Sequence, residues 1–182
     1  AAHLRVEVVD PGTQAPVAVD RVYVKPFGEP RAVVLRHAPD APPGVFEAAL
    51  APGDLHVTVE AKVGDRMPTL FGTVRAEVLA GSHRVTVPVR LRPALELVLE
   101  DGGVELPLEP DALPVVTRPD GLPFQPYFRW RRHAFVEFDQ PGRYHVALPP
   151  RDGYATPPPF EVDLDHGPPL VHTVRLERRG GG

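Results

Sequence analysis

Hydrophobic and polar residues alternate along most of this chain. Valine or leucine occupies every second position at 4–8, 22–24, 55–59, 85–91, 95–99 and 174–176. A period of two places successive side chains on opposite faces of an extended strand. Segment 73–80 is the best helix candidate, but its apolar residues also alternate and suit a strand equally well. Pro-Gly and Asp-Gly pairs separate the runs, so the pattern predicts an all-β protein of antiparallel sheets with one solvent-facing side.

The same pattern predicts two hairpins. The first pairs Leu50 with Leu55 across a Pro-Gly turn, and the second pairs Phe138 with Tyr144 across a Gln-Pro-Gly loop. Each register places the apolar residues of both strands on one face, and a slip by one residue would move all of them to the other face. We therefore expect the two strands of each hairpin to be neighbours in one sheet.

Two pairs of segments resemble each other across the chain. Residues 43–53 resemble 141–150 at an offset of 98, and residues 87–91 resemble 172–176 at an offset of 85. Two domains of about 90 residues suit the usual size of a β-sandwich. We place the boundary at Arg92-Pro93, which predicts one sandwich at 1–92, a second at 93–179 and a glycine tail at 180–182.

One of these segments carries a family resemblance. From Pro43 to Gly53 the chain reads Pro-Gly-x-aromatic-x-x-x-Leu-x-Pro-Gly, followed by an alternating strand. This string resembles the carboxypeptidase regulatory-like, or transthyretin-like, β-sandwich repeats. In the second half Leu148 is followed by an expanded turn in place of Pro-Gly. The resemblance implies two tandem Greek-key, immunoglobulin-like sandwiches that act as accessory, structural or binding modules without chemistry of their own.

An enzymatic branch of the transthyretin-like proteins ends in Tyr-Arg-Gly-Ser, which contributes to a hydrolase site. This chain reads Arg178-Arg179-Gly180 near its end. The enzymatic role is therefore not carried over, and we expect a protein that is not an enzyme.

The composition narrows the classes of function. The chain has no Cys, which excludes disulfides, zinc-thiolate sites and Cys nucleophiles. It also has no Asn and no Ile, and Arg greatly outnumbers Lys. GC-rich codon usage and a thermophilic source both explain this bias, and both stay open. Because the chain begins Ala1-Ala2, we expect either a processed mature form or an excised fragment.

The charge and hydropathy give no indication of nucleic acid or membrane as a partner. The formal net charge is −4 over 182 residues, whereas nucleic-acid-binding surfaces are basic. No apolar run approaches the roughly 20 residues that a membrane span needs. We expect no nucleic acid partner and no membrane insertion, and we expect a secreted or cell-surface protein.

Two short motifs could carry chemistry. Ser82 and His83 lie in a predicted turn between two strands, where Ser and Gly are ordinary turn formers and no strand–turn–helix elbow surrounds them. Asp163 and Asp165 project from one face of a predicted strand, but two carboxylates are too few for Ca²⁺. We therefore expect no catalytic residue, no metal site and no cofactor.

The stretch 124–133 combines four aromatic residues with three arginines before His133. Alternation places Phe128 and Trp130 in phase with the apolar residues that follow, which predicts that both lie in the core. Tyr127, Arg129 and Arg131 then share the outer face. Aromatic rings beside guanidinium groups stack on flat ligands, so these three residues form the predicted binding surface.

The two outermost predicted strands, 3–9 and 170–178, are long and alternating. Such strands can pair with another subunit if they lie at sheet edges; alternatively they pair within their own domains. The sequence thus favours a non-catalytic extracellular structural or interaction module, such as a bacterial surface, adhesion or filament subunit, with protein partners or self-assembly through edge strands. The alternative is a carbohydrate-binding accessory module of a larger secreted protein, which binds polysaccharide through the predicted surface at Tyr127.

Overall fold

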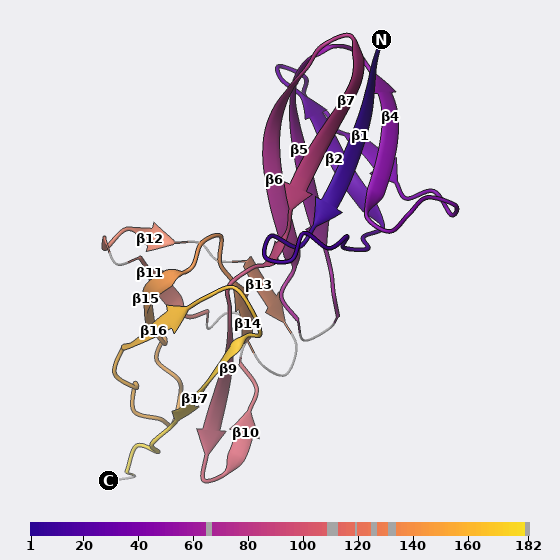
Figure 1. The fold of residues 1–182 in the computed structure, drawn as a ribbon. Coiled ribbons are helices and arrows are strands. Elements are labelled where there is room, and N and C mark those ends of the chain that lie inside the picture. The colour runs from indigo at the N-terminus through magenta and orange to yellow at the C-terminus, as the bar shows by residue number, and fades with distance from the viewer. Residues whose placement is uncertain (65–66, 109–112, 119, 125–126, 131–133, 181–182) are drawn as a thin grey trace. The chain divides into compact units, whose positions relative to one another are not determined.

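The computed structural model describes residues 1–64, 67–108, 113–118, 120–124, 127–130 and 134–180, with the backbone alone at 123–124, 127–130 and 134. These residues form strands and no helix (Figure 1), which confirms the all-β prediction. Accordingly, the described part of the chain contains no apolar helix of membrane-spanning length. The chain divides into two compact units, Ala1–Leu91 and Arg92–Gly182.

Unit 1 (Ala1–Leu91) contains two sheets. The first, sheet A, has the strand order β4 (Val45–Leu50), β1 (Ala2–Val9), β7 (Gly81–Pro88). The second, sheet B, has the order β3 (Val33–Arg36), β2 (Arg21–Pro26), β5 (Gly53–Ala61), β6 (Leu70–Val78), β8 (Arg90–Leu91). Alternate residues of both sheets meet in one core: Leu4 and Val6 from β1 are fully buried together with Val57 and Val59 from β5. Unit 1 is therefore a β-sandwich, and alternation selects its inner face.

Unit 2 (Arg92–Gly182) has the same plan. Sheet C contains β10 (Val104–Leu106), β9 (Ala94–Asp101), β14 (Ala134–Glu137), β13 (Tyr127–Trp130) and β17 (Leu170–Arg175). Sheet D contains β12 (Pro123–Phe124), β11 (Val115–Thr117), β15 (Gly142–Ala147) and β16 (Phe160–Leu164). Leu97 of β9 and Val146 of β15 are fully buried in the shared core. Strands β10 and β14 follow one another along one side of β9, and β17 lies along the other.

The two units share a seven-strand topology. The strands β1 to β7 of unit 1 correspond in order to β9, β11, β12, β14, β15, β16 and β17 of unit 2, and each pairs with the equivalent neighbours. Three of the described strands are additional: β8 pairs with β6, β10 with β9 and β13 with β14. In each unit the first of the seven shared strands lies between an antiparallel neighbour and the seventh strand, which is parallel to it. The sequence similarity between 43–53 and 141–150 therefore aligned β4 with β15, although the equivalent of β4 is β14. The similarity between 87–91 and 172–176 aligns the end of β7 with the end of β17, and these two strands are equivalent.

Both predicted hairpins are wrong. Strand β4 pairs with β1 in sheet A, while β5 pairs with β2 and β6 in sheet B. In the same way β14 belongs to sheet C and β15 to sheet D. The rings of Phe138 and Tyr144 still meet, at 4.4 Å between centroids. Because the inner faces of a sandwich oppose each other, apolar residues on both sides of a turn reach the same core when the turn crosses between sheets.

The predicted edge strands have different outcomes. Strand β1 is the central strand of sheet A, with β4 and β7 on its two sides, so it has no free edge. Strand β17 pairs with β9 on one side, and no described strand pairs with its other side. Both strands therefore pair within their own units, as the alternative expects, and only the outer side of β17 lacks a described strand.

Candidate functional site

The predicted binding surface lies on β13. The backbone of this strand pairs with β14, which sets Tyr127 opposite Glu137 and Arg129 opposite Phe135. Arg131 and the side chains of Tyr127 and Arg129 lie outside the described residues. A binding role for these three residues stays a prediction.

Ser82 and His83 lie within β7 and not in a turn. Consecutive residues of a strand project to opposite faces, so the two side chains do not form a nucleophile–base pair. His83 shares its face with the buried Val85 and Val87. Its Nε2 is buried and no described residue bonds to it.

The acidic pair near the end of β16 is bound by protein groups. Asp163 accepts two hydrogen bonds from Arg143, at 3.0 and 3.3 Å. Asp165 accepts a hydrogen bond from the backbone N–H of His166 at 2.7 Å. Across the described ranges, no three Asp, Glu or His side chains gather as a metal-binding group.

The pair of terminal strands is the first notable feature of unit 1. Strands β1 and β7 are parallel over eight residue pairs, from Ala2 opposite Gly81 to Val9 opposite Pro88. The backbone N–H of Val89 extends the pair by donating to the carbonyl of Val9 at 3.0 Å. Because the two strands are parallel, the chain enters unit 1 beside one end of this pair and leaves β7 at the other end (Figure 1).

Charged side chains connect the three strands of sheet A on its outer face. Arg5 of β1 donates to Glu7 at 2.9 Å and to Glu47 of β4 at 3.1 Å, and Arg84 of β7 also donates to Glu7. The hydrogen bond from Arg5, followed by that from Arg84, lowers the pKa of Glu7 below its ordinary value against the opposing effect of burial. We call these four residues the sheet A network.

In unit 2 a charged pair also connects the first strand to the chain that follows its parallel partner, at the end of β9 and β17. Asp101, the last residue of β9, accepts hydrogen bonds from Arg178 at 2.9 Å and from the Tyr154 hydroxyl at 2.9 Å. These bonds, with Arg178 contributing most, lower the pKa of Asp101. The same carboxylate raises the pKa of the Tyr154 hydroxyl. The segment after β17 is thereby attached to the end of β9.

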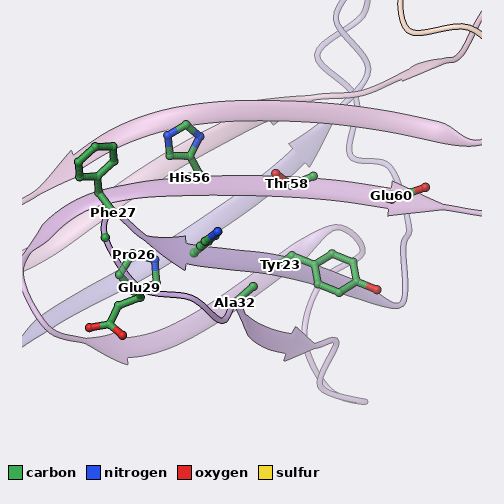
Figure 2. A pocket seen from close by; sticks show the side chains of 10 residues that line it. Tyr23, Pro26, Phe27, Glu29, Ala32, His56, Thr58 and Glu60 are labelled. Carbon is green, nitrogen blue, oxygen red and sulfur yellow. The ribbon is translucent and has the colours of Figure 1, made fainter. Parts of the chain in front are cut away.

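The outer face of sheet B carries an open groove of about 690 Å³. Its lining comes from β2, β5 and the turn after β2: Tyr23, Lys25, Pro26, Phe27, Gly28, Glu29, Ala32, His56, Thr58 and Glu60. Cross-strand pairing sets Tyr23 beside Thr58 and Lys25 beside His56. Figure 2 shows Phe27 and His56 toward one end of this groove and Tyr23 and Glu60 toward the other.

A tight turn presents Phe27 at the end of the groove. The N–H of Glu29 donates to the carbonyl of Pro26 at 3.2 Å, and Gly28 has a φ of 83°, as the third position of a type II turn requires. The N–H of Phe27 donates to the carbonyl of Asp54 at 2.8 Å. Arg75 lies 5.5 Å from the centre of the Phe27 ring. The ring is thus held in place although the residue is 70% exposed.

Sequence reasoning did not single out this groove. Alternation assigns Tyr23, Lys25, His56 and Thr58 to a solvent-facing side, where polar residues need no further explanation. The available signal was the Pro-Phe-Gly-Glu turn, which places a large apolar residue where the chain must be exposed.

No family model and no curated protein matches the chain. Among solved structures it is similar to the TIE protein of Bacillus anthracis, at 14% identity and a TM-score of 0.41 over 97% of this chain and 34% of that one. It is also similar to the minor pilin GBS52 of Streptococcus agalactiae, at 11% identity and a TM-score of 0.47 over 100% of this chain and 98% of that one. A third similar structure is the shaft pilin SpaA of Lactobacillus rhamnosus GG, at 10% identity and a TM-score of 0.48 over 98% of this chain and 97% of that one. The chain spans about a third of the TIE protein. Similarity at this level assigns no function to the chain.

Proposed function

We propose that the chain is a non-catalytic structural module of a surface or filament protein, and that each unit carries tension along the chain. The parallel pairing of the first strand with the last long strand of each unit is the observation that carries this proposal. It is present over eight residue pairs in β1 and β7 and over six in β9 and β17.

The direction of the load follows from this pairing. Tension on the chain before β1 and after β7 pulls the two strands along their length in opposite directions. The hydrogen bonds between them are then loaded together, whereas strands pulled apart from one end lose their bonds one at a time. Each bond contributes only about 0.5–1.5 kcal/mol to equilibrium stability, so resistance to force comes from simultaneous loading.

The charged groups support the same role. Glu7 of β1 binds Arg84 of β7, and Asp101 of β9 binds Arg178 just after β17. Exposed ion pairs contribute little to equilibrium stability. Both pairs, however, join the two segments that tension would separate, so they are loaded with the strands.

Pulling the full chain from its two ends tests the proposal. We expect two discrete unfolding events, each releasing about 300 Å for the roughly 90 residues of one unit. Arg84→Ala should lower the force of one event and leave the other unchanged. Gradual extension without discrete events would contradict a load-bearing role.

A further inference from the structure

Most polar side chains of the sheet B groove have no hydrogen-bond partner among the described residues. This holds for Lys25, Glu29, His56, Glu60 and the Tyr23 hydroxyl, whereas the hydroxyl of Thr58 lies 3.2 Å from that of Thr73. On the same sheet, by contrast, Arg75 binds Asp54 at 3.1 Å. The groove therefore gathers ammonium, imidazole, carboxylate and hydroxyl groups that are free to bond to a ligand.

Two aromatic side chains accompany these groups. Tyr23 lies on β2 and Phe27 is the first residue after this strand; four residues of extended chain correspond to about 13 Å. Phe27 is 70% exposed, so a ligand that covers its ring gains the free energy of burying apolar surface. Apolar ring faces on either side of hydrogen-bonding groups match a ligand that has C–H faces and hydroxyls in alternation, which is the chemistry of linked sugar rings.

The charge of the groove favours a neutral ligand. The lining residues include the cationic Lys25 and the carboxylates of Glu29 and Glu60. Arg21 lies 5.8 Å from the Tyr23 ring centre and Arg75 lies 5.5 Å from that of Phe27. Positive and negative groups thus nearly balance, so the groove lacks the cationic excess that an anionic polymer requires.

The shape of the groove favours a chain over a small molecule. It is an open groove over β2 and β5 on the outer face of a sheet, and its labelled side chains are spread along these two strands (Figure 2). Sites for small molecules enclose most of the ligand surface, whereas an open strip allows a polymer to pass through and continue beyond both ends.

We infer that the outer face of sheet B in unit 1 binds a neutral polysaccharide chain, with sugar rings stacked on Phe27 and Tyr23 and with Lys25, His56, Thr58 and Glu60 bonding to hydroxyls. This inference goes beyond the load-bearing role and does not depend on it.

Affinity electrophoresis of the full chain tests the inference. The probes are hydroxyethyl cellulose, xyloglucan, galactomannan, laminarin and soluble starch as neutral polysaccharides, and alginate as an anionic one. We expect at least one neutral polysaccharide to retard the protein. Phe27→Ala and Tyr23→Ala should each weaken that retardation at least tenfold.

A matched control separates binding from folding. Leu79 is 61% exposed in unit 1 and lies outside the groove, so Leu79→Ala should bind as strongly as the natural chain. Thermal unfolding of all three variants should show an unchanged unit 1. Proline-rich peptides also dock on aromatic-lined grooves. Titration with such a peptide tests whether the groove binds a peptide in place of a polysaccharide.

Three results would overturn the inference. They are a lack of retardation by every neutral polysaccharide, retardation that Phe27→Ala and Tyr23→Ala leave unchanged, and selective binding of alginate or of the proline-rich peptide through the same residues. Each of these results leaves the load-bearing proposal untouched, because pulling experiments test it separately.

Discussion

The two sheets of unit 1 share one core but differ on their outer faces. On sheet A the charged residues bind one another: Arg5 and Arg84 both donate to Glu7, and Arg5 also reaches Glu47. On sheet B, Lys25 and Glu60 have no bonding partner among the residues that the structure describes. A face whose polar groups are mutually satisfied stabilises the sheet and offers little to a ligand. A face with free groups and exposed rings can bind.

The strands that would carry tension and the groove also lie on different sheets. Strands β1 and β7 belong to sheet A, and the groove belongs to sheet B. In the proposed role, sheet A carries the tension while sheet B, on the other side of the core, presents the groove. Leu4 of sheet A lies in one buried cluster with Val57 and Val59 of sheet B, and this core joins the two sheets.

The largest expected effect comes from the place where β6 of sheet B passes the end of β7. A Cβ on Gly72 would lie 2.2 Å from the carbonyl oxygen of Pro88 and 2.9 Å from a methyl group of Val89. Gly72→Ala should therefore destabilise unit 1 by about 3 kcal/mol through overpacking. Chemical denaturation measures this change.

Gly64→Ala is the control for that substitution. A Cβ at Gly64 has no described atom within 4 Å, so the stability should change by less than about 0.5 kcal/mol. Equal effects of the two substitutions would contradict the close approach of β6 to the chain after β7.

Matched substitutions on the two outer faces test the comparison itself. Glu7→Gln removes the charge that Arg5 and Arg84 share and should cost about 1 kcal/mol, the upper end of the range for solvent-exposed ion pairs. Glu60→Gln removes a carboxylate without a described partner and should change stability by less than about 0.5 kcal/mol. Equal losses in denaturant titrations would show that the two faces do not differ.

The pH dependence of stability has a definite sign. The pKa values of Glu7 and Asp101 lie below the values of 4.5 and 3.8 expected without these contacts. Both groups therefore stabilise the folded chain above those values, and the contribution is lost as the pH falls through the folded-state pKa. Thermal unfolding between about pH 6 and pH 3 should show this decline, with a smaller slope for Glu7→Gln. An unchanged slope would contradict the role of Glu7.

A smaller effect, of opposite direction, is expected at His83. Its buried Nε2 lacks a partner among the described residues, and an unsatisfied polar group costs free energy. His83→Leu should raise stability by about 1 kcal/mol, seen as a higher Tm. His145→Leu is the control, because His145 is exposed and its Nδ1 lies 3.3 Å from a carboxylate oxygen of Glu161. An equal rise in Tm for His145→Leu would show that the buried, unbonded nitrogen of His83 does not explain the gain in stability.

Alternation in the sequence predicted which residues face a core, because burial selects every second position of a strand. It did not predict which strands are neighbours. Phe138 and Tyr144 meet across the core, yet the hairpin register explains their contact equally well. Likewise nothing in the pattern of 3–9 distinguishes a central strand from an edge strand, since pairing on both sides depends on β4 and β7, which are distant in sequence.

The candidate groove was beyond prediction for a related reason. Lys25 and His56 become neighbours only through the pairing of β2 with β5. Glu7 forms ion pairs because the strand pairing of sheet A brings Arg84 close to it. The sequence pattern alone does not separate Glu7 from Glu60, which has no such partner among the described residues. The predicted surface at Tyr127, Arg129 and Arg131 rested on local aromatic density, and its side chains lie outside the described residues.

Directional pulling on unit 1 tests the load-bearing role most directly. The chain has no Cys, so engineered cysteines provide unique handles. With handles at Ala1→Cys and at Pro88→Cys, the last residue of β7, the pair β1 and β7 is loaded along its length. With handles at Ala1→Cys and Ser82→Cys the same pair is opened from one end. We predict a rupture force several-fold higher in the first geometry. Equal forces in the two geometries would contradict the proposal that the parallel terminal strands carry the load.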